Sequence, residues 1–139
     1  MSTGKTYHGS CLCRATKFTL SGEPFHYTIC HCKNCKHASG SAFLSHAIFK
    51  TSQFTITEGE CLITHYADSD TQSGNTITRS FCSKCGSPLF LRPMKDGIIL
   101  IHPGQIEEPV LWVPKKESYS HEKLPWLKEI TIQQKKAKL

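Results

Sequence analysis

The chain has 139 residues, a length that suits one domain and leaves little room for a second. Its longest aliphatic run, at 98–101, is far shorter than the roughly 20 residues of a membrane-spanning helix, so we expect no membrane association. The net charge is +6, but residues 1–114 carry 10 Lys and Arg against 8 Asp and Glu, while residues 115–139 carry 7 against 3. The excess lies mostly near the end of the chain, and no pattern of stacking aromatics accompanies it, which argues against a nucleic-acid partner.

The predicted elements are short strands between turns. Apolar and polar residues alternate at 17–20, 54–57 and 77–81, which is the period of a half-buried strand. The stretch 67–75 is a polar loop. Two buried strands are predicted at 89–91 and 98–101, with the turn sequence RPMKDG between them. Helical signals are weak, with one turn after Cys35 and an interrupted start before Pro125. The sequence predicts a mainly β fold of short antiparallel strands.

Signals for cellular location are few. The first ten residues, MSTGKTYHGS, contain no apolar segment of the kind found in a signal peptide, so we expect a cytoplasmic protein. The last three residues, AKL, are a close variant of the S-K-L peroxisomal address, which makes peroxisomal targeting the alternative prediction.

Seven of the eight cysteines fall into three clusters, at 11 and 13, at 30, 32 and 35, and at 82 and 85, and Cys61 stands alone. Disulfides are rare inside cells, and a C-x-C spacing is too tight for an easy local bridge. A thioredoxin-like redox motif at 82–85 needs a βαβ setting, whereas its flanks are typical of strands. Zinc takes four ligands in a tetrahedron and commonly binds thiolates, so the clusters predict zinc binding.

Spacing leaves two divisions of the sulfurs open. In the first, two closed four-cysteine sites use all eight cysteines, with Cys61 completing the cluster at 30–35. In the second, one closed site has four ligands, Cys11, Cys13, Cys82 and Cys85, and a second zinc has only three, Cys30, Cys32 and Cys35. Three protein ligands with an exchangeable fourth position are typical of a catalytic zinc.

Three stretches follow one another along the chain: HGSCLCRATKFTLSGEP, CHCKNCKHASGSAF and RSFCSKCGSPLF. In this order they resemble the glutathione-dependent formaldehyde-activating (GFA) family, which shares its domain with centromere protein V (CENP-V). The stretch WVPKKESYSHEKLPWL resembles the closing segment of that family. The resemblance spans about residues 7–127, which we expect to form one GFA-type zinc domain, and it leaves 128–139 as a basic C-terminal tail.

The resemblance implies a β-tent fold, which is a small β-rich zinc domain, and it implies the second division of the sulfurs. Four cysteines match the family's structural zinc ligands: Cys11, Cys13, Cys82 and Cys85. Three others match its active-site zinc cluster: Cys30, Cys32 and Cys35. Cys61 matches no family position, and we expect it to be a small buried or half-buried residue.

The activity that the resemblance implies is that of a carbon–sulfur lyase, with two zinc ions per chain as cofactors. Glutathione and formaldehyde would be joined to give S-hydroxymethylglutathione, or released from it. An open position on zinc can take a thiol and remove its proton, and the thiolate can then attack an aldehyde carbon. The alternative function is a non-catalytic zinc-binding module for an acidic or macromolecular partner.

Four further residues are singled out beside the clusters. Arg14 stands where family members commonly have Gly, and Lys36 stands where many have Arg or Gln. Since thiolate neighbours already crowd the ion, we expect His31 to point away from it, although it lies between two candidate ligands. Arg79 lies on a strand that leads into the cluster at 82–85, and we expect it to form an ion pair.

Overall fold

The computed structural model describes residues 4–95 and 97–127 of the chain. Within these residues the chain forms ten β-strands, one α-helix and four short 3-10 helices. The strands form two sheets, one of three strands and one of seven. The predicted mainly β fold is therefore confirmed.

The smaller sheet contains β1 (Thr6–Ser10), β2 (Lys17–Ser21) and β5 (Phe54–Glu58), in the order β1-β2-β5. Both pairs of neighbours are antiparallel. The alternation seen in the sequence buries Phe18 and Leu20 on one face of β2. This sheet therefore supplies one side of the hydrophobic core.

The larger sheet has the order β10-β3-β4-β9-β8-β7-β6. Its strands are, in that order, β10 (Lys116–Ser118), β3 (His26–Cys30), β4 (Leu44–Lys50), β9 (Ile98–Ile101), β8 (Pro88–Pro93), β7 (Ile77–Cys82) and β6 (Ile63–Asp68). All neighbours are antiparallel except β10 and β3, which run parallel. The prediction of antiparallel strands fails at this pair because β10 arrives at the end of a long connection, and a parallel neighbour needs such a crossover.

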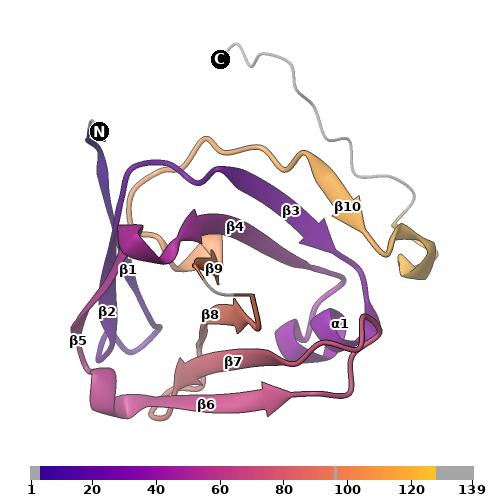
Figure 1. Ribbon diagram of the computed structural model, residues 1–139, viewed down its shortest axis with the longest axis horizontal. Helices are drawn as coiled ribbons and strands as arrows, with labels where there is room; N and C mark the ends of the chain where they lie inside the picture. The colour runs from indigo at the N-terminus through magenta and orange to yellow at the C-terminus, as the bar shows by residue number, and fades with distance from the viewer. Residues whose placement is uncertain (1–3, 96, 128–139) are drawn as a thin grey trace.

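The larger sheet curls around, so that β3 and β4 face β6 and β7 across the molecule (Figure 1). The helix α1 (Lys33–Ser39) lies at one end between these two layers, and the smaller sheet lies at the other end (Figure 1). The segment that carries the cluster at 30–35 is therefore held inside the open end of the curled sheet.

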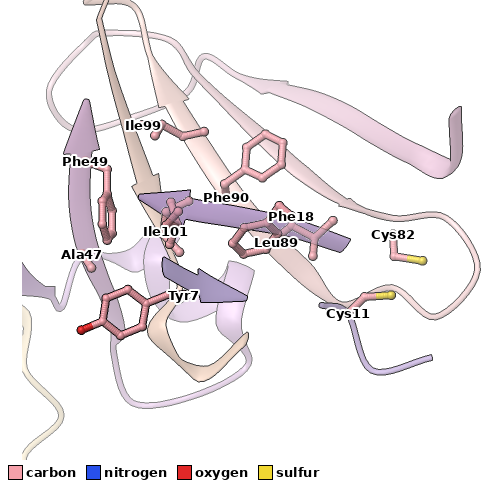
Figure 2. Close-up of a cluster of buried hydrophobic side chains, with 11 residues drawn as sticks. Tyr7, Cys11, Phe18, Ala47, Phe49, Cys82, Leu89, Phe90, Ile99 and Ile101 are labelled. Carbon is pink, nitrogen blue, oxygen red and sulfur yellow. The ribbon is translucent and has the colours of Figure 1, made fainter. Parts of the chain in front are cut away.

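The hydrophobic core lies where the two sheets meet, and Figure 2 shows its side chains. Ala47 and Phe49 come from β4 and pack with residues of β9, β8 and the smaller sheet. The sequence LFL at 89–91 is buried throughout, as predicted for a strand covered on both faces. Cys11 and Cys82 lie side by side at the edge of this core (Figure 2).

Several elements differ from the sequence prediction. Strands β1, β3, β4, β6 and β10 were not predicted, and β6 extends to Asp68, into the segment predicted as a loop. The helix α1 begins at Lys33, before Cys35, and the stretch before Pro125 forms only a 3-10 turn, Ser120–Glu122. Among the described residues, every helix is too short or too polar to span a bilayer. The basic tail at 128–139, with its AKL terminus, lies outside the described residues.

Candidate metal centre

Two groups of cysteine sulfurs come together in the fold, and they follow the second division of the sequence analysis. In each group the sulfur atoms all lie within 4.8 Å of one another. The first group, called here the four-sulfur group, contains Cys11, Cys13, Cys82 and Cys85. The second, called the three-sulfur group, contains Cys30, Cys32 and Cys35.

The four-sulfur group has the dimensions of a zinc tetrahedron. The sulfur of Cys13 lies 3.6 Å from that of Cys11 and 3.9 Å from that of Cys82. A tetrahedron with zinc–sulfur bonds of about 2.3 Å has sulfur–sulfur edges of roughly 3.8 Å. Because Cys11 and Cys82 are buried at the edge of the core, the residues of this group fit a closed zinc site that joins β7 to the turn after β1.

Two tight turns bring the sulfurs of the four-sulfur group together. In the first, Arg14 has a φ of 68°, in the left-handed region, and its N–H donates to the carbonyl of Cys11. In the second, Gly86 has a φ of 78°, and its N–H donates to the carbonyl of Cys82. A left-handed position suits Gly, which has no Cβ, and this turn forms with Arg14 in its place.

Backbone N–H groups in these turns point at sulfur atoms. The N–H of Thr16 donates to the sulfur of Cys11 at 3.4 Å, and that of Lys84 donates to the sulfur of Cys82 at 3.3 Å. Burial raises the pKa of Cys11, but the bonds from Thr16 and the neighbouring thiols outweigh it and bring the pKa to about 7. The hydroxyl and N–H of Ser87 lower the pKa of Cys85 to about 5. Both effects favour the thiolate forms of Cys11 and Cys85, the forms that bind a metal.

The three-sulfur group is built around the start of α1. Cys30 ends β3, Cys32 is the N-cap of the helix, and Cys35 lies in its first turn. The sulfur of Cys32 accepts a hydrogen bond from the N–H of Cys35 at 3.3 Å, so the capping interaction itself fixes the position of one sulfur. A hydrogen bond from the Cys35 thiol lowers the pKa of Cys30 to about 6, and the same bond, with burial, raises the pKa of Cys35.

The three-sulfur group opens onto a cleft of about 570 Å³, called here the thiol cleft. All three cysteines line it, together with residues of β3, β4, β7, β8 and β10. Within the part of the chain that the structure describes, no fourth His, Cys, Asp or Glu ligand atom joins this group. Its residues fit a metal site with three protein ligands at the wall of this cleft.

His31 points away from the sulfurs, as expected. Its ring is fully buried, and its Nε2 atom lies 2.8 Å from a carboxylate oxygen of Glu117, which in turn pairs with Lys123 at 3.1 Å. The ring also packs edge-on against Phe43, with 5.8 Å between ring centres. His31 therefore ties the segment between two candidate ligands to β10.

The expectation for Cys61 was wrong. We expected a buried or half-buried residue, but Cys61 is exposed and belongs to neither group of sulfurs. It lies in the 3-10 helix Glu60–Leu62, which connects β5 to β6 and contains no buried residue. Lys36, by contrast, donates from its ammonium group to the carbonyl of Glu122 at 2.6 Å, so it attaches α1 to the C-terminal segment.

Two buried histidines near the thiol cleft were not singled out from the sequence. His46 lines the cleft from β4, and its ring lies 5.9 Å from that of His102. Burial, together with the charges of His102 and Arg79, lowers the pKa of His46 to about 3. Burial also lowers the pKa of His102, to about 4. The available signal was the two-residue spacing of His46 from Leu44 and from Ile48. In a strand this spacing puts the three side chains on the same face, which indicates that His46 is buried with its apolar neighbours.

The expected ion pair of Arg79 is present. Its Nε atom donates to Asp68, on the neighbouring strand β6, at 2.9 Å. The amide of Asn34, which lies between Cys32 and Cys35, donates to both carboxylate oxygens of Asp68 at 3.1 Å. A chain of hydrogen bonds thus connects the helix of the three-sulfur group to Arg79, which itself lines the thiol cleft.

The fold and the two thiol groups define a small, mainly β domain with two groups of cysteines that could hold metal ions. The family model described as glutathione-dependent formaldehyde-activating enzyme matches residues 6–122, and the chain belongs to this family. No curated protein sequence matches the chain. A protein of Rhodobacter sphaeroides with a known crystal structure is similar in fold, with a TM-score of 0.59 and 17% identity, over 75% of this chain and 91% of that one. At this identity the similarity concerns the fold alone.

Proposed function

We propose that the protein joins a thiol to an aldehyde, or releases them, at a zinc ion held by Cys30, Cys32 and Cys35. Glutathione and formaldehyde are the substrates that the family's name suggests. The observation that carries the proposal is the contrast between the two thiol groups. The four-sulfur group is complete and lies at the edge of the core, whereas the three-sulfur group lacks a fourth protein ligand among the described residues and lines a cleft.

The reaction needs no co-reactant beyond its two substrates. The S–H bond of the thiol breaks, a C–S bond forms to the aldehyde carbon, and the proton ends on the former carbonyl oxygen. A bound zinc ion would supply a Lewis acid that takes up an external thiol and favours its thiolate at neutral pH. The closed four-sulfur group would hold a second, structural zinc.

The chain's own contribution is to hold and enclose the reactants. The three sulfurs are carried by the end of β3 and the first turn of α1. Because these are regular elements, they hold the distances between the sulfurs more constant than a loop would. The thiol cleft can hold a thiol and an aldehyde side by side, and such positioning replaces a bimolecular encounter by a reaction within one complex.

Zinc content and turnover test the proposal together. We expect the purified protein to contain two equivalents of zinc, and Cys32→Ser to contain one. Cys61→Ser is the matched control, because this exposed thiol belongs to neither group, and it should keep both. The rate of adduct formation from glutathione and formaldehyde should fall to the uncatalysed rate in Cys32→Ser alone. Two equivalents of zinc in Cys32→Ser would refute the assignment, and a wild-type protein with two zinc ions and no turnover would favour a non-catalytic zinc module.

A further inference from the structure

We propose that Arg79 selects the ligand of the thiol cleft by binding a carboxylate on it, so that the preferred thiol is an acidic one. This inference rests on the proposed function, in that the ligand's sulfur is taken to meet the three-sulfur group. Besides the contact between the ligand's sulfur and the three-sulfur group, the ligand would make a second contact, with Arg79 in the wall of the cleft. Three observations carry it.

The first observation is the charge of the cleft wall. Three cationic residues line the thiol cleft, Arg79, Lys95 and Lys116. No Asp or Glu of the described residues lines it. A cleft with one sign of charge attracts ligands of the opposite sign, so an anionic ligand is favoured over a neutral one.

The second observation is that the guanidinium group of Arg79 is only partly used. Among the described residues its one hydrogen bond runs from Nε to Asp68. Its Nη1 atom is buried and has no partner within the same residues. A buried donor without an acceptor is unfavourable, so the guanidinium group has hydrogen-bonding capacity that Asp68 does not use. The fork of a guanidinium group matches a carboxylate, which accepts two parallel hydrogen bonds.

The third observation is that Arg79 is held at a fixed place relative to the sulfurs. Asp68 is buried and accepts from Arg79 on one side and from Asn34 on the other. Asn34 belongs to the same helical turn as two of the cysteines. This chain of hydrogen bonds therefore holds Arg79 in place relative to the three-sulfur group. A site that binds a thiol and a carboxylate of the same molecule requires such fixed positions.

The test compares two thiols of the same length in binding to the zinc-loaded protein. In 3-mercaptopropionate a carboxylate stands where 3-mercapto-1-propanol has a neutral hydroxymethyl group. Isothermal titration calorimetry at pH 7.5 gives both dissociation constants. We expect the carboxylate thiol to bind about tenfold more tightly or better, as a charge-assisted pair of hydrogen bonds predicts.

The variants are chosen so that no buried charge is left alone. The double variant Asp68→Asn with Arg79→Gln removes both partners of the ion pair, and it should bring the two dissociation constants within about twofold of each other. Arg79→Lys keeps a positive charge beside Asp68 but has no fork, and it should reduce the difference at least about threefold. Arg92→Gln is the control, because Arg92 lies over the rings of Phe54 and Phe90, and it should leave the difference unchanged.

The outcomes separate this inference from the proposed function. If both thiols bind the wild-type protein equally well, or if the difference survives in the double variant and in Arg79→Lys, Arg79 does not select the ligand, while the thiol site stands. If neither thiol binds the wild-type protein, the thiol site and the selection by Arg79 are both refuted.

Discussion

Acid should destabilise this fold through the two buried histidines, His46 and His102. Burial lowers their pKa values to about 3 and about 4, against about 6.5 for an ordinary histidine. The unfolded chain therefore takes up protons on both rings below pH 6.5, while the folded protein keeps both rings neutral to lower pH. The stability that the neutral rings contribute is complete above pH 6.5 and is lost as the pH falls toward 4 and 3.

The size of the effect follows from the width of this pH window. Each ring lowers the free energy of unfolding by about 1.4 kcal/mol per pH unit below 6.5, for as long as the ring stays neutral in the folded protein. Between pH 6.5 and 5 this amounts to about 2 kcal/mol per ring, or about 4 kcal/mol for the pair. Both rings are more than nine-tenths buried, so screening by solvent does not reduce the effect to the level of a surface pair.

The assay is urea unfolding at pH 7.5 and at pH 5.0, with the two free energies of unfolding subtracted. Because the wild type and the variants carry the same thiol groups, the pH dependence of metal binding cancels between them. His46→Gln should reduce the loss of stability between the two pH values by about 2 kcal/mol. His37→Gln, at an exposed histidine, should leave the loss unchanged. Equal losses in the wild type and in His46→Gln would refute the reasoning.

Three further changes test the turns and the four-sulfur group. Arg14→Gly should raise the free energy of unfolding by about 1 kcal/mol in urea titrations, because it relieves a left-handed residue; a loss of stability would count against this. Gly59→Ala should lower it by at least about 2 kcal/mol, since Gly59 has a φ of 74° and a Cβ there would overlap the carbonyl oxygen of Ala15; an unchanged urea midpoint would contradict the reasoning. Cys85→Ser should reduce the zinc content from two equivalents to one and lower the melting temperature, and a melting curve like that of Cys61→Ser would show that Cys85 holds no structural zinc.

The parts of the fold that could be predicted from the sequence are those with a short-range signal. Alternation over four or five residues indicated β2, β5 and β7, and continuous apolar runs indicated β8 and β9. β4 and β6 were missed because each carries a buried polar residue, His46 in β4 and Asp68 in β6. Asp68 is buried where it pairs with Arg79 of β7, and a local pattern does not show such a partner.

The candidate site was predictable only in part, for a related reason. The clusters are local features, but which clusters meet depends on the sheet order, and spacing alone left two divisions open. The family resemblance selected the division that leaves Cys61 outside both sites, and among the described residues the sulfur of Cys61 joins neither group. The exposure of Cys61 and the hydrogen-bond chain from Asn34 to Arg79 depend on long-range packing, and no spacing indicated either.

The number of sulfur ligands around the bound zinc tests the central claim most directly. X-ray absorption spectroscopy at the zinc edge measures this number as an average over both ions. One site with four protein sulfurs and one with three give an average of (4 + 3)/2, or about 3.5, and a bound thiol raises it to about 4. We predict a rise from about 3.5 to about 4 when glutathione is added to the wild-type protein. An average of 4 before glutathione is added, or no change on its addition, would contradict an open zinc site at Cys30, Cys32 and Cys35.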